Sequence, residues 1–185
     1  MYVSLRKRRR KQRGRGYFRH LSLADKRHLQ KEPWFFDWET MLNPASPFEV
    51  HGLFAANHHL LALMAVDFSP GVATVEYVER AGYKTDRPVA YHILPHLIGY
   101  ACELNFRVFG DYILVIIPKT TPIMVDMYNQ ILNTTLAYIP QQAIDLGYTY
   151  SWAVQWHGDE RRDAIYVQGY CAKAMRDLYY KKEGS

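Results

Sequence analysis

The chain has 185 residues, of which 49% are hydrophobic, 15% aromatic and 22% charged, and its formal net charge at pH 7 is +5. This length and composition fit one globular domain whose core buries roughly two thirds of the surface of the unfolded chain. No apolar run approaches the ~18 residues that a membrane-spanning helix needs, and the basic N-terminus lacks the apolar segment of a secretory signal. We therefore expect a cytoplasmic protein with no membrane partner.

Positive charge is concentrated at the start of the chain. Nine of the 23 Lys and Arg residues precede Asp25, the first acidic residue. A cationic segment punctuated by glycine buries little apolar surface, so we expect residues 1–20 to form a basic, disordered arm and residues 21–185 to form one domain. Two interpretations of the arm remain open: a solvated tail, or a segment that binds nucleic acid or a ribonucleoprotein through counterion release.

The first half of the predicted domain combines a short helix with three strands. Ser22 is a candidate N-cap for a helix over residues 23–31, with Asp25 at the capping-box position. The aromatic cluster at residues 34–38 indicates either core packing or a platform on which bases stack. Three apolar runs, at residues 50–56, 60–68 and 72–78, are separated by turn residues and predict an antiparallel meander.

The pattern changes to a helical period over residues 89–106. Because a proline is tolerated only in the first turn of a helix, we expect this helix to begin near Leu94 or Pro95, and Gly110 to end it. Residues 112–117 form a continuous apolar run typical of a strand buried on both faces.

Pro122 opens a second helix over residues 123–132. The remaining predicted elements are residues 136–140, 148–156 and 164–180, of which the last is interpreted as a helix. Antiparallel strands followed by a strand–helix–strand unit predict an α+β fold with a mixed central sheet flanked by helices.

Sequence motifs exclude several kinds of chemistry. There is no P-loop, no nucleophile elbow, no zinc-protease motif and no Rossmann fingerprint. His92 and His96 have the i, i+4 spacing of a zinc pair, but no third ligand lies at a telling spacing, and Cys102 and Cys171 are isolated. We therefore predict neither a metal site nor a disulfide framework.

The connection from strand 72–78 to the next helix has the arrangement of an anion-binding site. A helix N-terminus carries free backbone N–H groups and the positive end of the helix dipole, and together these suit a pyrophosphate. If strand 112–117 runs parallel to strand 72–78 and splays away from it, an extended cofactor arm fits between the two strands.

From Pro33 onward the order of segments resembles the GNAT acetyltransferase superfamily, and in particular its small bacterial members. Order and spacing carry the resemblance, which extends over about half of the chain. The matching segments are PWFFDWE (33–39), YVERAGY (77–83), HLIGYACELN (96–105), GDYILVIIPKT (110–120) and MVDMY (124–128).

The resemblance implies a GNAT-like fold and an enzyme that transfers the acetyl group of acetyl-CoA to an amine acceptor. It places the cofactor between the two splayed strands, with its pyrophosphate at the start of the following helix. The cofactor-binding residues that it implies are Tyr77, Val78, His92, Leu94, His96 and Leu97.

The resemblance also implies two catalytic residues. Glu79 matches a carboxylate at the end of the cofactor-facing strand and is the candidate general base, whereas Tyr128 matches a tyrosine early in the later helix and is the candidate general acid. A surface carboxylate and a core tyrosine are the competing interpretations.

The chain departs from the family at its phosphate-binding loop. YHILPHL, residues 91–97, has no glycine where the family has R/Q-x-x-G-x-G/A, and Pro95 lacks an N–H. This departure removes contacts that the family makes to the cofactor. The leading prediction is still the N-acetyltransferase, and the alternative is a non-catalytic GNAT-like binding or structural module that the basic arm directs to nucleic acid or a ribonucleoprotein. The sequence leaves open whether the C-terminal third completes the sheet within one chain or across a homodimer.

Overall fold

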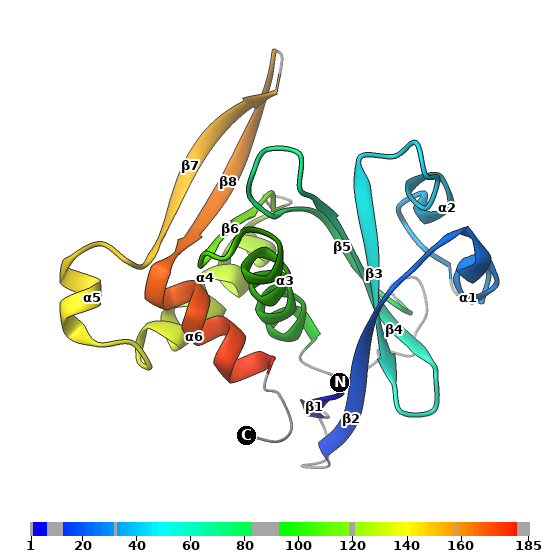
Figure 1. Ribbon diagram of the computed structural model, residues 1–185, viewed down its shortest axis with the longest axis horizontal. Helices are drawn as coiled ribbons and strands as arrows, with labels where there is room; N and C mark the ends of the chain where they lie inside the picture. The colour runs from blue at the N-terminus through cyan, green and yellow to red at the C-terminus, as the bar shows by residue number, and fades with distance from the viewer. Residues whose placement is uncertain are drawn as a thin grey trace.

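The computed structural model describes residues 2–6, 13–31, 33–82, 93–118, 121–157 and 159–180. These residues form one mixed eight-stranded sheet in the order β1-β2-β3-β4-β5-β6-β8-β7, with helices on both faces (Figure 1). The predicted α+β class with a mixed, helix-flanked sheet is confirmed.

The predicted meander is also confirmed. Strands β3 (Phe48–Ala55), β4 (Leu60–Asp67) and β5 (Thr74–Arg80) pair antiparallel in sequence order. The turn between β3 and β4 contains His58 at a positive φ of 63°, and the turn before β5 contains Gly71 at 79°. Glycine reaches this left-handed region without steric cost, which explains the turn at Gly71.

The prediction of a disordered arm over residues 1–20 is wrong for the strands β1 (Tyr2–Arg6) and β2 (Arg13–His20). Strand β2 pairs antiparallel with β3, so the edge of β3 satisfies its backbone hydrogen bonds. Two aromatic side chains secure it: Phe18 stacks on Tyr100 at a centroid distance of 4.1 Å, and Tyr17 stacks on Phe54 at 5.4 Å. Residues 1 and 7–12 of the predicted arm lie outside the described residues.

One face of the meander is covered by the short elements η1 (Leu23–Asp25), α1 (Lys26–Leu29) and α2 (Trp38–Met41) (Figure 1). The helix predicted over residues 23–31 is therefore shorter, although Asp25 does accept a hydrogen bond from the Ser22 N–H at 3.0 Å. In the aromatic cluster, Trp38 is buried and Trp34 and Phe36 pack beside it on this face, whereas Phe35 is 57% exposed. The buried residues of this smaller core are Leu21, Leu29, Trp38, Leu42, Val50, Phe54, Leu60, Leu63 and Ala65.

The strand–helix–strand unit follows its prediction closely. Helix α3 (Ile93–Phe109) has Pro95 as its third residue, where the missing N–H would have had no partner within the helix. Gly110, at a φ of 78°, ends the helix, and strand β6 (Ile113–Ile116) buries Leu114, Val115 and Ile116. No helix of the described chain has both the length and the apolar character needed to cross a bilayer.

The C-terminal third corrects two predictions. Residues 136–140 form no separate element, because they are the end of helix α4 (Pro122–Leu136) and its connection to the short α5 (Gln141–Asp145). Residues 164–180 are not one helix, because β8 (Glu160–Gln168) occupies the first part and α6 (Gly169–Tyr179) the second. Gly169, at a φ of 51°, lies at the change from strand to helix, which an apolar pattern alone does not locate.

Strand β8 lies between β6 and β7 (Tyr150–His157), antiparallel to both. The sheet is therefore completed within one chain. The hairpin of β7 and β8 projects beyond the rest of the molecule (Figure 1).

Helices α3, α4 and α6 share the main core on the face opposite α1 and α2. Gly99 permits α3 and α6 to approach closely: a Cβ at this position would lie 2.8 Å from the Met175 carbonyl oxygen and 2.9 Å from the Tyr179 Cβ. The helices thus meet with main chain against main chain, and a side chain at residue 99 has no room.

Gly99→Ala should lower the free energy of unfolding. Alanine favours a helix over glycine by about 1 kcal/mol, but overpacking against the rigid backbone of α6 costs about 1–3 kcal/mol and outweighs that gain. Urea denaturation measures the change, with Gln130→Ala on the exposed side of α4 as the control. A Gly99→Ala protein as stable as the parent would show that the helices move apart freely.

Candidate functional site

Strands β5 and β6 are the only parallel pair in the described sheet, and they pair over a short distance. Their ladder consists of Thr74↔Val115 and Val75↔Ile116, after which β5 continues alone on this side to Arg80. The Ile117 N–H donates to the Val75 carbonyl at 2.9 Å as the strands part. Beyond Val75, no described strand pairs with β5 on this side, and we call the place where β5 and β6 part the fork.

A β-bulge marks the point where the fork opens. Val66 pairs with Val75 and Ala65 pairs with Tyr77, so Glu76 has no partner on β4. A bulge adds a residue to one strand, bends it and increases its twist, and bulges are common beside active sites. The bulge at Glu76 accounts for the divergence of β5 from β6.

The far side of the fork is β8. Its pairing with β6 ends at Ile116↔Ile165, yet β8 runs on to Glu160. Among the described strands, β8 is therefore the one that faces β5 past the end of β6.

One ion pair spans the fork. Arg162 on β8 donates to both carboxylate oxygens of Glu76, with Nη1 3.5 Å from Oε1 and Nη2 closer to Oε2. The exposed fractions of the two side chains are 24% and 12%, so the pair is largely removed from solvent.

Glu79, the candidate base, lies at the end of β5 and is buried. Its carboxylate accepts hydrogen bonds from the Phe35 N–H, from the Phe36 N–H at 3.1 Å and from the Trp38 indole at 2.8 Å. These three hydrogen bonds to one carboxylate hold residues 35–38 against the end of β5. The structure thus gives Glu79 an anchoring role that the sequence did not suggest, and its role as a base stays a prediction.

Tyr77 and Val78 lie on opposite faces of β5. The Tyr77 ring packs edge-on against Phe36 at 4.9 Å and Phe48 at 5.5 Å, on the face of α1 and α2, whereas Val78 packs against the main core. Their side chains therefore contact protein, and what they offer to the fork is their backbone.

The start of α3 contains the remaining predicted cofactor residues. His92 lies outside the described residues, and the side chains of Leu94 and Leu97 are buried in the core. His96 Nδ1 is 2.9 Å from the Tyr179 carbonyl oxygen. Because a carbonyl only accepts, this Nδ1 carries the proton, and Nε2 donates to a phosphate only in the imidazolium form.

Tyr128, the candidate acid, lies in the second turn of α4, a helix capped by Thr121. The side chain is 1% exposed and belongs to the main core, together with Val75 of β5 and Ile116 of β6. Burial raises the pKa of the Tyr128 hydroxyl, so the group is fully protonated at neutral pH.

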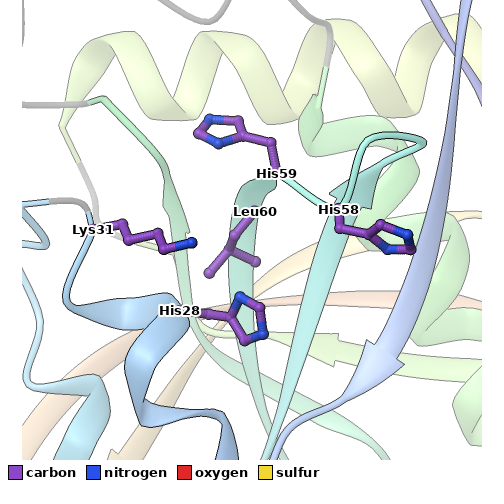
Figure 2. A pocket seen from close by; sticks show the side chains of 5 residues that line it. All are labelled: His28, Lys31, His58, His59 and Leu60. Atoms are coloured by element: carbon purple, nitrogen blue, oxygen red, sulfur yellow. The ribbon is translucent and has the colours of Figure 1, made fainter.

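Two hollows of the described surface lie away from the fork. The smaller, of 30 Å³, is lined by His28, Lys31, His58, His59 and Leu60. Figure 2 shows that its basic side chains do not converge on one point, since the His58 ring points away from Lys31; His58 Nδ1 is instead 2.6 Å from the Tyr17 hydroxyl. The larger, of 590 Å³, lies between residues 20–24 and 41–50 and contains neither candidate catalytic residue.

Sequence reasoning missed Glu76 and Arg162. Regular alternation along β5 would place Glu76 and Glu79 on opposite faces, and only the bulge changes that. Arg162 lies 86 residues farther along the chain, and no spacing connects it to Glu76. Within the described residues, no three His, Cys, Asp or Glu side chains come together as a metal would require.

No protein-family model and no curated protein matches the sequence. Among solved structures, a chimera of the Vibrio cholerae spermidine N-acetyltransferase SpeG with hSSAT is 11% identical, with a TM-score of 0.52, over 90% of this chain and 99% of that one. SpeG of Vibrio cholerae in complex with manganese ions is also 11% identical, with a TM-score of 0.50, over 90% of this chain and 97% of that one. At this identity the likeness concerns the fold: the chain has the GNAT acetyltransferase fold.

Proposed function

We propose that this chain is an acyl-CoA-dependent N-acetyltransferase that acetylates an amine. The observation that carries the proposal is the fork, where a bulged strand leaves one edge unpaired beside a parallel ladder of two residue pairs. The structural neighbours named above are N-acetyltransferases, which supports this use of the fold. Their acceptor is spermidine, and the acceptor of this chain is a separate question.

The described residues fit acetyl-CoA in two respects. The edge of β5 over residues 76–80 offers backbone donors and acceptors to an extended, amide-containing chain, as an adjacent strand would. At the start of α3, the N–H groups of Ile93 and Leu94 precede the first i→i−4 bond of the described helix and suit a pyrophosphate. When bound, acetyl-CoA supplies the activated acetyl group.

Two residues of the chain carry out the proton transfers of this proposal. Tyr128 donates its hydroxyl proton as general acid; burial keeps the hydroxyl protonated at neutral pH, although the raised pKa also makes it a weaker acid. Glu79 acts as general base through a bound water, because its carboxylate already accepts three hydrogen bonds. The same carboxylate keeps residues 35–38 against the end of β5.

Acetyl-CoA should stabilise the protein against thermal unfolding. A ligand present at 100 times its dissociation constant adds about 2.7 kcal/mol to the free energy of unfolding if it binds only the folded state. Differential scanning fluorimetry measures the shift, with ATP as the control for non-specific phosphate binding. An unchanged melting temperature at millimolar acetyl-CoA would remove the enzymatic proposal.

Tyr128→Phe should slow turnover by ~10²–10⁴-fold, the usual contribution of a general acid, while the affinity for acetyl-CoA stays the same. The substitution keeps the ring and its packing and removes only the hydroxyl. Steady-state kinetics and isothermal titration separate the two quantities, and Tyr138→Phe, at a position 64% exposed, is the matched control. Full turnover in the Tyr128 variant would exclude it as the acid.

Glu79→Gln should lower the free energy of unfolding by about 1–3 kcal/mol, because an amide cannot accept from all three donors and leaves at least one unpaired. Glu39→Gln, which removes an exposed partner of Lys26, should change it by about 0.5 kcal/mol or less. Chemical denaturation gives both values. Turnover of the folded Glu79 variant tests the second role: normal kcat would leave Glu79 as an anchor and exclude it as the base.

A further inference from the structure

The ion pair between Glu76 and Arg162 lies at the fork, where an acceptor has to reach the acetyl group. Arg162 lies on the face of the sheet opposite Ile165, because the two are three residues apart on β8 and Ile165 belongs to the main core. This is the face of α1 and α2, and Glu79 also points to it. An acceptor that approaches the fork along this face meets one fixed anion and one fixed cation.

The two charges restrict what can bind between them. A ligand that takes only one partner leaves the other without its counter-ion in a position largely removed from solvent, which is costly. A polycation such as spermidine would satisfy Glu76 but would lie beside the freed guanidinium of Arg162. A ligand with an ammonium and a carboxylate close together replaces both partners at once.

The geometry of Arg162 favours a carboxylate in particular. Both of its terminal nitrogens point to the two oxygens of Glu76, so the planar guanidinium group is already arranged to bind a carboxylate. Glu76 is the unpaired residue of the bulge and directly follows Val75, the last residue of β5 that pairs with β6.

We propose that the acceptor is a zwitterionic amine of the amino-acid class, whose ammonium binds Glu76 and whose carboxylate binds Arg162. The inference rests on the proposed N-acetyltransferase function and adds to it the class of acceptor. The intact ion pair is then the state of the free protein: Glu76 lies where the ligand's carboxylate would lie beside Arg162, and Arg162 lies where the ligand's ammonium would lie beside Glu76.

The test compares matched acceptors that differ only in the carboxylate. L-lysine with cadaverine, L-phenylalanine with 2-phenylethylamine and glycine with methylamine form three such pairs, and spermidine is the polycation. Thermal shift with each compound measures binding, and mass spectrometry of the N-acetyl product measures transfer. We expect at least one amino acid to be acetylated with a kcat/KM at least tenfold above that of its decarboxylated partner and above that of spermidine.

The preference for acceptors with a carboxylate should depend on Arg162 and not on Arg161. Arg162→Gln should abolish the preference for the carboxylate, and Arg162→Lys should retain part of it, whereas Arg161→Gln, on the same strand but the opposite face, should leave it unchanged. Glu76→Gln should raise the KM of the acceptor and leave that of acetyl-CoA as it was.

Preference for spermidine or for the bare amines, or an Arg162→Gln protein with unaltered discrimination, would overturn the inference. So would the absence of binding and transfer for all three amino acids in a protein that still shows the acetyl-CoA shift. Loss of that shift in the parent protein would instead reject the underlying function, so the two failures are distinguishable.

Discussion

The candidate site depends on one constraint: the parallel pairing of β5 and β6 ends after two residue pairs. Strands β5 and β6 pair through two residues each, and the bulge at Glu76 then turns β5 away. An unpaired strand edge inside a protein is unfavourable unless its N–H and C=O groups have a partner. The rest of the fold keeps this edge in place, which is the physical reason for proposing that a ligand binds there.

Three groups of contacts hold the two sides of the fork. On one side, Glu79 fastens residues 35–38 to the end of β5 through buried hydrogen bonds. On the other side, α3 follows β5 and α6 follows β8, and the close approach of these two helices at Gly99 fixes them against each other. Between them, Arg162 and Glu76 join the two halves of the sheet directly. The fork is thus a separation of strands within a braced sheet.

Elements whose limits depend on residues close in sequence were predicted correctly. The meander, the start of α3 at its proline and the end of that helix at Gly110 all follow from turn chemistry and hydrophobic period. Strand β2 was missed because its stability comes from the edge of β3 and from stacking on Tyr100, both distant in sequence. The change from β8 to α6 was missed because apolar residues continue from one segment into the other, and the break depends on the backbone of Gly169.

The candidate site was predictable to a similar degree. The sequence located the fork and named Glu79 and Tyr128, but it did not reveal that the Glu79 carboxylate would be bonded to residues 35–38, some 44 positions away. Nor did it reveal Glu76, whose position depends on a bulge, or Arg162, whose partner is set by the order of strands in the sheet. Long-range pairing, which a single sequence does not encode in any spacing, accounts for each of these omissions.

The most direct test of this account is hydrogen exchange of the β5 backbone with and without acetyl-CoA. If the cofactor lies along the open edge, the amides of residues 76–80 should exchange more slowly in its presence, while the turn between β3 and β4 exchanges as before. Unchanged exchange over residues 76–80 at saturating acetyl-CoA would show that the edge of β5 is not where the cofactor binds, and would contradict the account.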